Sequence, residues 1–255
     1  MLASYGYDPA NQLIGIGYAN GGTVLGNLTY AYDAAGRRIQ MGGTLANMNL
    51  PVAVNGAAYD AVNRLTNWVG ASLTYDTNGN MSSDDTLTYT WDSRNRLSLL
   101  SGGATASFTY DAAGRRSSKT AGGIATNFAY DGLNVVQELS GGAASASMLT
   151  GLRLDEIFSR TEAAQGTRSF ITDALGSTLA LTDDTGAIKT SYAYEPFGTT
   201  TARGEASSNS SQYTGRENDG SGLYYYRARY YHPTFGRFIA EDQIGFAGGV
   251  ISIAT

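Results

Sequence analysis

The sequence has no cysteine, a single histidine, four prolines and few charged residues. The lack of cysteine excludes disulfides, thiolate metal sites and cysteine nucleophiles, and one histidine cannot build a histidine-rich metal site. No apolar run reaches 18 residues, so we expect no membrane span. The opening MLASYGYDPA has neither the basic segment nor the apolar stretch of a signal peptide, so any export signal would lie elsewhere.

Positive charge is scarce and dispersed. The net charge is −5, and the pairs Arg37–Arg38 and Arg115–Arg116 stand far apart in the sequence. A nucleic-acid interface needs a concentrated basic face. We therefore expect no nucleic-acid binding.

Glycine and tyrosine are abundant. The 255 residues include 33 glycines and 18 tyrosines, and this glycine content is roughly twice the usual ~7%. This composition indicates many tight turns between short strands, and the aromatic rings supply area that can be buried. The length is sufficient for one large β domain or two smaller ones.

A seven-residue unit recurs along the chain. It consists of an aromatic residue, an acid, two variable residues, Gly or Asn, and two further residues, and YDAAGRR occurs identically at 32–38 and 110–116. The other clear copies are YDPANQL (7–13), YDAVNRL (59–65), YDTNGNM (75–81), WDSRNRL (91–97) and YDGLNVV (130–136), and looser copies start at Thr172, Thr182, Tyr194 and Tyr231. The irregular spacing predicts a fixed turn between strands of variable length.

The chemistry of the unit fits a hairpin corner. An Asp side chain accepts hydrogen bonds from backbone N–H groups just after it, and Gly or Asn tolerates positive φ. The corner residues predicted in this way are Tyr32, Asp33, Gly36, Tyr75, Asp76, Gly79, Trp91, Asp92, Tyr110, Asp111, Gly114, Tyr130 and Asp131.

The residues between the corners alternate as strands do. In LTYTWD, for example, Leu87, Tyr89 and Trp91 share one face, and Gly-Gly pairs supply the opposite turns. We expect the arginines after each corner to lie along tyrosine faces. The predicted fold is all-β, with repeated antiparallel hairpins that form a curved or spiralling sheet.

The unit resembles the YD repeat of the Rhs proteins, which is also found in the C components of Tc toxins and in teneurins. The resemblance extends to the C-terminal third, where 154–198 and YTGRENDGSGLYYYRARYYHPTFGRFIAEDQIGFAGG (213–249) are similar to the Rhs-associated core. The motif residues of this core are Gly222, Leu223, Tyr224, Tyr225, Arg229, Tyr230, Tyr231, Gly236, Arg237 and Phe238. We expect a YD-repeat array over 1–150 and a core-like region over 151–255.

The resemblance implies a structural role. Such repeats form a shell segment that encloses or presents a C-terminal toxin polypeptide, in a secreted or cell-surface system, and the core acts as a plug. The implied partner is that toxin cargo or another protein, and no cofactor or metal is implied. The family also offers a second reading, in which carbohydrate binds to rows of aromatic rings; Trp68 and Trp91 would then be the residues to test.

A third reading is a partial aspartyl autoprotease. In the family a catalytic aspartate follows GRF, and Asp242 of GRFIAEDQIG matches it, with Gln243 in place of the usual proline. An aspartyl protease needs two carboxylates that share a proton, and the sequence ends at Thr255 before the second motif. The alternative for Asp242 is a turn or ion-pair carboxylate beside Arg237. His232 stands where the family has Asp, and we interpret it as a turn residue.

Overall fold

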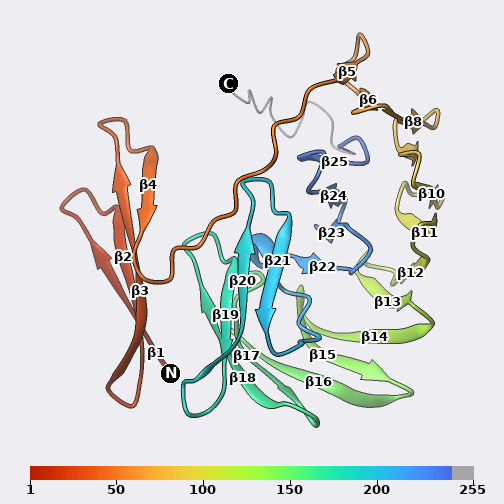
Figure 1. Ribbon diagram of the computed structural model, residues 1–255. Coiled ribbons are helices and arrows are strands. Elements are labelled where there is room, and N and C mark those ends of the chain that lie inside the picture. Colours follow the sequence, from red (N-terminus) through yellow and green to blue (C-terminus); the bar gives the residue numbers. More distant parts are fainter. Residues whose placement is uncertain (243–255) are drawn as a thin grey trace. The chain divides into compact units, whose positions relative to one another are not determined.

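The computed structural model describes residues 1–242, and it is built almost entirely from antiparallel strands (Figure 1). Its described part contains one short 3-10 helix, η1 (Tyr213–Gly215), and no α-helix. The all-β prediction is therefore confirmed. No helix among these residues is long and apolar enough to cross a membrane.

The contacts between residues divide the chain into two compact units. Unit 1 joins Met1–Pro51 to Asn127–Asn218, and unit 2 joins Val52–Thr126 to the residues from Asp219 onward. Each unit thus combines segments that are distant in the sequence. The predicted boundary near residue 150 stays a prediction.

Unit 1 holds a four-stranded sheet and a longer run of strands, both ordered as in the sequence. The four-stranded sheet consists of β1 (Leu2–Tyr7), β2 (Leu13–Asn20), β3 (Thr23–Tyr32) and β4 (Arg38–Gly42). The longer run consists of β14 (Ile124–Asp131), which crosses the unit boundary, β15 (Asn134–Ser140), β16 (Ala143–Thr150), β17 (Ile157–Glu162), β18 (Gly166–Thr172), β19 (Thr178–Thr182), β20 (Ile188–Tyr194) and β21 (Thr200–Gly204). The short β22 (Glu217–Asn218) ends this unit.

Unit 2 is built in the same way. A three-stranded sheet contains β5 (Ala57–Tyr59), β6 (Leu65–Trp68) and β7 (Ala71–Ser72). The strands that follow are β8 (Thr74–Tyr75), β9 (Met81–Ser83), β10 (Leu87–Trp91), β11 (Leu97–Gly102), β12 (Ala106–Tyr110) and β13 (Arg116–Ala121). The C-terminal segment adds β23 (Tyr224–Tyr225), β24 (Tyr230–His232) and β25 (Arg237–Phe238).

The repeated unit forms one kind of corner. At Asp111 the backbone N–H donates to the Arg115 carbonyl (2.8 Å), and the Gly114 N–H donates to the Asp111 carbonyl (3.0 Å). Gly114 has a φ of +82°, and the strand register shifts just before Tyr110. This is a three-residue hairpin loop whose last residue adopts positive φ. The same two backbone bonds occur at Asp8, Asp33, Asp60, Asp76, Asp92, Asp173, Asp183 and Glu195.

The aspartate side chain stabilises the corner as expected. The Asp33 carboxylate accepts from the N–H groups of Ala35 (3.0 Å) and Arg37 (2.9 Å), and from the Arg37 side chain (2.7 Å). The hydrogen bond from the Arg37 N–H, followed by that from its side chain, lowers the pKa of Asp33. Asparagine takes the positive-φ position at Asn11, Asn63 and Asn95. These hydrogen bonds favour the ionised form of the Asp33 carboxylate, which stabilises the turn.

The copy at Tyr130 differs from the others. Asp131 pairs with Asn134 inside the β14–β15 ladder, and the chain reverses over Gly132 and Leu133 alone. Gly132 takes positive φ (+57°) one residue after the aspartate instead of three. A two-residue turn therefore replaces the predicted corner, because the strand pairing extends past the aspartate.

Five corners are linked to an earlier corner by their aromatic side chains. The polar atom of the ring donates to the carbonyl of the residue six positions after the first residue of that earlier corner. The bonds run from Tyr32 to Leu13 (2.8 Å), Tyr75 to Leu65 (2.8 Å), Trp91 to Met81 (2.8 Å), Tyr110 to Leu97 (2.7 Å) and Tyr194 to Thr178 (2.5 Å). We call the residue at this sixth position the slot residue. Four of the five bonds join a corner to the one before it, and the bond from Tyr194 reaches past the Thr182 corner to the Thr172 corner.

The predicted arginine–aromatic contacts are present. The Arg64 guanidinium carbon lies 5.2 Å from the centre of the Tyr75 ring, and that of Arg96 lies 4.5 Å from the Tyr110 ring. In both cases the arginine of one corner covers the aromatic ring of the next. Each such contact contributes about 0.5–1 kcal/mol when exposed.

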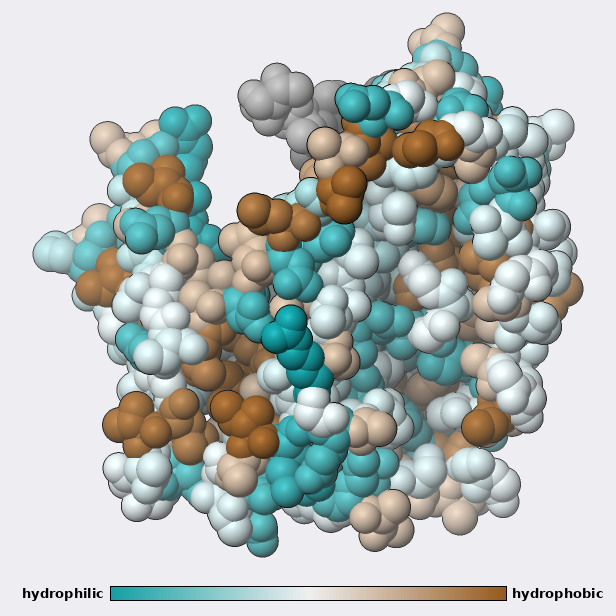
Figure 2. All heavy atoms as spheres, viewed as in Figure 1, coloured by the Kyte–Doolittle hydropathy of each residue, from teal (hydrophilic) through white to brown (hydrophobic). Residues whose placement is uncertain are grey.

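Each unit has its own apolar core. The core of unit 1 contains Ile16, Leu28, Ile171 and Leu181, and that of unit 2 contains Leu65, Met81, Leu97 and Leu100. The space-filling view shows a largely pale and teal surface with separate brown patches (Figure 2).

Candidate functional site: the seats of the C-terminal segment

In unit 1 a segment with little regular structure, residues 205–218, is fixed mainly by polar contacts; we call it the strap. The Gln165 side chain donates to the Ala206 carbonyl (2.6 Å), and the Thr178 hydroxyl donates to the Ser211 carbonyl (2.7 Å). Near the strap's end, the Thr214 N–H donates to the Ser177 hydroxyl (3.1 Å). These bonds attach the strap to the hairpins of β17–β19.

Arg160 of β17 is the central anchor of the strap, and its side chain is 6% exposed. Its guanidinium binds both carboxylate oxygens of Glu138 (2.9 and 2.8 Å), the Glu162 carboxylate (2.5 Å) and the Ser208 hydroxyl (3.1 Å). Burial raises the pKa of Glu162, but the hydrogen bonds from Ser208 and Arg160 outweigh it and leave that pKa lowered. A buried arginine is tolerated here because two carboxylates pair with it.

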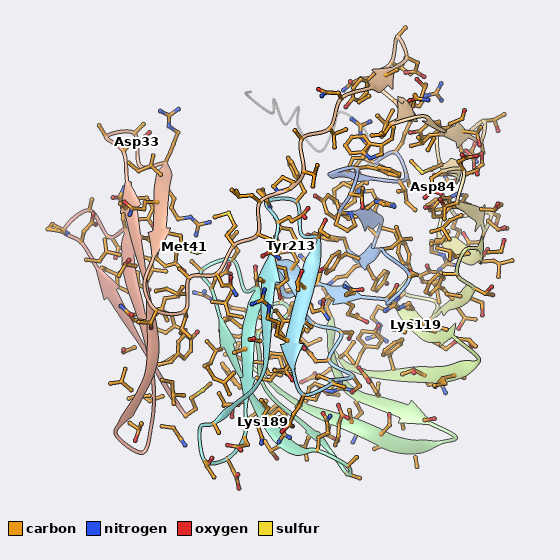
Figure 3. The ribbon with its side chains drawn as sticks, viewed as in Figure 1. Asp33, Met41, Asp84, Lys119, Lys189 and Tyr213 are labelled. Atoms are coloured by element: carbon orange, nitrogen blue, oxygen red, sulfur yellow. The ribbon has the colours of Figure 1, made fainter. Side chains whose placement is uncertain are left out.

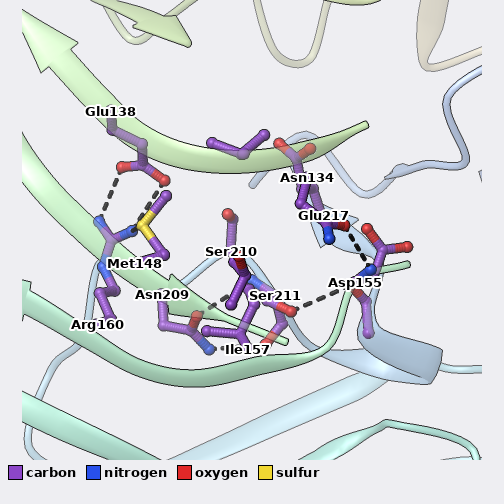
Figure 4. Close-up of a pocket in the computed structure, with 13 residues that line it drawn as sticks. Asn134, Glu138, Met148, Asp155, Ile157, Arg160, Asn209, Ser210, Ser211 and Glu217 are labelled. Atoms are coloured by element: carbon purple, nitrogen blue, oxygen red, sulfur yellow. Dashed lines mark hydrogen bonds and ion pairs between the residues drawn. The ribbon is translucent and has the colours of Figure 1, made fainter. Parts of the chain in front are cut away.

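A small cavity lies beside this anchor (Figure 4), and it has a volume of about 30 Å³. Asn134, Glu138, Ser210 and Glu217 are among the residues that line it. A cavity of this size has room for water but not for an organic ligand. The Arg216–Asp155 ion pair closes the other end of the strap.

In unit 2 the residues 219–242, which we call the tyrosine-rich segment, pack into the core. Leu223, Tyr224, Tyr225 and Tyr230 are at most 3% exposed. The Met81 N–H donates to the Ile239 carbonyl (2.8 Å). The segment is thus part of the hydrophobic core of its unit and also bonds to the backbone of a corner.

A buried ion pair lies under this segment. The slot residues of the three preceding corners in unit 2 are Leu65, Met81 and Leu97, and the fourth is Arg116; all four are fully buried. The Arg116 guanidinium lies 2.6 and 2.8 Å from the two Asp219 carboxylate oxygens, and both side chains have 0% exposure. A charge in a slot otherwise filled by leucine or methionine needs this partner, because burying it unpaired would be strongly unfavourable.

Aromatic rings and a second cation complete the buried site around Arg116 and Asp219, which we call the seat. The Arg116 guanidinium carbon lies 4.2 Å from the Tyr225 ring centre and 5.5 Å from that of Phe108. Lys119, labelled in Figure 3, approaches Asp219 at 3.2 Å. The Tyr230 hydroxyl accepts from Arg116 (3.3 Å), and burial raises the pKa of Tyr230 well above its usual value. The phenol therefore stays neutral.

A second acidic group lies close to β24. Asp84, at the turn before β10, accepts hydrogen bonds from the Leu87 N–H (2.7 Å) and the Tyr89 hydroxyl (2.5 Å). Nε2 of His232 lies 3.7 Å from the Asp84 carboxylate, and the imidazole stacks on Phe235 with ring centres 3.8 Å apart. Burial lowers the pKa of His232 to about 4, so the side chain is neutral at pH 7.

Asp242 is exposed. It pairs with Arg229 (3.0 Å), whereas Arg237 donates to the Asn63 carbonyl (3.1 Å) and lies over the Tyr59 ring. No group of three histidine or acidic residues suited to a metal exists within residues 1–242. The residues from Gln243 on lie outside the described part, so a catalytic role for Asp242 stays a prediction.

The predicted core-motif residues come together in β23–β25. Gly222 and Gly236 take positive φ in the turns, and Arg229 lies 3.9 Å from the Phe238 ring centre. The motif residues that contribute to the buried core are Leu223, Tyr224, Tyr225 and Tyr230, and Tyr231 packs edge-on against Phe238.

The sequence analysis did not identify Asp219, Asp84 or the strap as anchors. In the Tyr110 copy, Arg takes the slot position that Leu or Met fills in the other corners of unit 2. The identical Tyr32 copy has an exposed arginine there, so the slot residue alone does not predict a buried acidic partner 103 residues later.

Comparison with known proteins agrees with this architecture. The family model for the teneurin YD-shell matches residues 1–247. The chain therefore belongs to the YD-shell family, which includes the Rhs-type repeats that it resembles.

Several relatives carry the word nuclease or toxin in their names. The chain is 34% identical to the tRNA3(Ser)-specific nuclease WapA of Bacillus spizizenii over 92% of its own length and 10% of that protein. It is 27% identical to the double-stranded DNA deaminase toxin A of Burkholderia cenocepacia, over 96% of its length and 21% of that protein. The chain thus spans only a small part of these relatives.

The solved structures show the same fold. The TcdB2-TccC3-Cdc42 structure matches with a TM-score of 0.66 and 19% identity, over 97% of this chain and 17% of that one. The TcdB2-TccC3-TEV structure gives a TM-score of 0.65 at the same identity and coverage.

Proposed function

We propose that this chain is a segment of a YD-repeat shell that encloses or presents a C-terminal toxin polypeptide. The observation that carries the proposal is the series of corners, in which five pairs are tied by an aromatic hydrogen bond and two of these pairs also by an arginine over the ring. Such a series builds an extended wall from small units that could not bury their aromatic faces alone.

The relatives support a scaffold role. One is named a tRNA nuclease and another a DNA deaminase, yet both match almost the whole of this chain. Two different chemistries in proteins that share this region point to catalysis by another part of each protein. The region itself then supplies the container, and we place the system at the cell surface or outside the cell.

The carbohydrate reading is less favoured. Trp91 is half-buried and donates its Nε1–H to the Met81 carbonyl, and Trp68 packs edge-on against Phe235 (5.6 Å). Both rings are used in internal packing, whereas sugar stacking needs an exposed ring face. Binding on a glycan array that is lost in Trp68→Ala would revive this reading.

Protease protection tests the shell proposal. In the full-length protein that contains this chain, we expect the C-terminal polypeptide to resist a protease that degrades it once released. Arg116→Glu places two like charges in the buried seat and is expected to abolish protection, whereas the exposed control Arg38→Glu preserves it. Equal digestion of the C-terminal polypeptide in the wild-type protein and in Arg116→Glu would contradict the proposal.

Protein localisation can be tested separately. Fractionation of the producing cell, with an antibody against this chain, is expected to find it in the medium or at the surface. Retention of all the protein inside the cell would contradict that part of the proposal.

A further inference from the structure

A segment without regular structure crosses from unit 1 to unit 2 between β4 and β5. We call residues 50–55 of this segment the linker; no strand or helix is assigned to them (Figure 1). The residues on both sides are anchored. The Asn49 N–H donates to the Tyr194 carbonyl (3.0 Å), and the Gly56 carbonyl accepts from the Val69 N–H (3.3 Å).

The linker exposes both its side chains and its backbone. Leu50, Val52 and Val54 are 84%, 87% and 45% exposed. Within residues 1–242, the backbone N–H and C=O groups of the linker make no hydrogen bond. Susceptibility to proteolysis depends on the burial and hydrogen bonding of the backbone, because a segment that is paired in a sheet must unpair before it is cut. The linker needs no such opening.

The exposed hairpin turn between β15 and β16 shows the difference. Ala143 and Ala144 are as small as the linker residues and are also exposed, but they pair with Ser140 and Leu139 in the ladder of these two strands. Exposure is therefore shared by the turn and the linker, whereas the unbonded backbone belongs to the linker.

The sheet that precedes the linker is held to the rest of unit 1 by contacts other than the linker. The strands β2 and β3 share one buried apolar cluster with β18 and β19. The Tyr18 hydroxyl donates to the Thr172 carbonyl (2.8 Å), and the Tyr30 hydroxyl accepts from the Ala174 N–H (3.0 Å). A break in the linker leaves all these contacts in place.

The linker also lies where the aromatic links between corners are interrupted. Tyr75 donates to Leu65 of the corner before it. Within residues 1–242, no such bond joins Tyr59 to Arg38, the slot residue of the Tyr32 corner. A break between these two corners therefore separates no pair that an aromatic hydrogen bond connects.

We propose that the linker is a site of proteolytic processing by an endopeptidase that accepts small aliphatic side chains, and that the cut chain stays assembled as two pieces. Val52, Ala53 and Val54 offer such side chains on the amino side of the scissile bond. Water is the second reactant: the peptide C–N bond breaks, the carbonyl carbon gains the hydroxyl and the new amine gains the proton. This inference does not depend on whether the shell encloses a cargo.

Limited proteolysis with pancreatic elastase tests the site. We expect the first cut of the 255-residue chain after Val52, Ala53 or Val54, as identified by the masses of the fragments. Replacing all three by Asp is expected to abolish this cut. Ala143→Asp with Ala144→Asp is the matched control, in the paired turn, and should be cut in the linker like the wild type. A first cut after either of these two alanines in the wild-type chain would overturn the proposal.

Trypsin tests the accessibility of the linker independently of its native side chains. The sequence between Arg38 and Arg64 contains no lysine or arginine, so trypsin has no native site there. We expect Ala53→Arg to create the first trypsin cut in the chain. A faster cut at Arg37, whose side chain is 81% exposed at a corner, would show that the linker is not the most accessible segment and would refute the proposal.

Size-exclusion chromatography of the cut chain tests whether the pieces stay together. We expect them to elute as one species in native buffer and to separate in urea. Tyr18→Phe removes a hydroxyl that binds both the carbonyl and the N–H of Thr172. It is expected to raise the dissociation constant of the two pieces roughly tenfold and to leave the rate of the cut unchanged. Separation of the wild-type pieces in native buffer would contradict the two-piece assembly.

Discussion

The heptapeptide YDAAGRR folds twice into the same corner, and the two copies end in different surroundings. In both, the aspartate side chain binds the backbone and the first arginine, with Arg37 and Arg115 each 2.7 Å from their carboxylates. The last arginine differs. Arg38 is exposed over Tyr30 (5.2 Å), while Arg116 is fully buried against Asp219.

This difference shows which part of the fold is determined by the local sequence. Seven residues suffice to define the turn, because all its hydrogen bonds lie within them. The burial of the last side chain is decided by a residue 103 positions away, which only unit 2 supplies. The same sequence can therefore serve as an exposed corner or as the anchor of a buried segment.

The largest contrast is expected from removing the last arginine in each copy. Arg116→Met introduces the residue found in the Tyr75 copy but leaves Asp219 buried with Lys119 alone. Breaking a buried pair costs about 3–5 kcal/mol, and we expect a loss near the lower end because Lys119 remains. Arg38→Met should change the free energy of unfolding by less than about 0.5 kcal/mol. Urea unfolding measures both.

A double variant separates charge from packing. Arg116→Met with Asp219→Leu removes both charges, and replacing a buried pair by apolar residues is often neutral. We expect it to regain most of the stability lost in Arg116→Met. Equal losses in Arg116→Met and Arg38→Met would show that the buried pair does not distinguish the two copies.

Acid is expected to act on unit 2 through His232. Its pKa is lowered from 6.5 to about 4 by burial, so the folded state binds the proton less well than the unfolded state. Stability is then fully present above pH 6.5 and is lost as the pH falls toward 4. The shift corresponds to about 3 kcal/mol, and Asp84 is the charged group that faces the imidazole.

His232→Gln removes this titration. We expect its unfolding free energy to change less between pH 7 and pH 4.5 than that of the wild type, as measured by urea unfolding at each pH. Identical pH profiles for the two proteins would show that another group controls the acid response.

The corners could be predicted from sequence because their stabilising contacts are local. Asp33, Gly36, Asp111 and Gly114 behave as the turn chemistry requires, and the all-β fold follows from the repeat. Asp131 does not form the predicted corner, because the pairing between β14 and β15 continues past it. The contacts that hold the strap and the tyrosine-rich segment were not predictable. Arg116–Asp219 and Arg160–Ser208 join residues far apart in the chain.

The aromatic link is expected to show a smaller contrast. Tyr110→Phe removes a hydroxyl that binds the Leu97 carbonyl (2.7 Å) and approaches Tyr230 (3.3 Å). The equivalent Tyr32→Phe removes one bond, to Leu13. A typical hydrogen bond contributes about 0.5–1.5 kcal/mol, so we expect the greater loss in Tyr110→Phe. A greater loss in Tyr32→Phe, by urea unfolding, would contradict a tighter seat in unit 2.

The smallest contrast belongs to the turn glycines, for which the two copies should agree. Gly36 and Gly114 have φ of +77° and +82°. An added Cβ would meet no atom within 4 Å at Gly114, and at Gly36 only the flexible end of the Gln12 side chain, at 3.1 Å. Alanine at either site therefore costs only the strain of a left-handed backbone, about 1–2 kcal/mol. Asn63→Gly, at a corner with φ of +62°, should show no such loss, because glycine adopts this conformation freely. If Gly36→Ala and Gly114→Ala differed by more than that strain in urea unfolding, the turn would not be the locally determined part of the repeat.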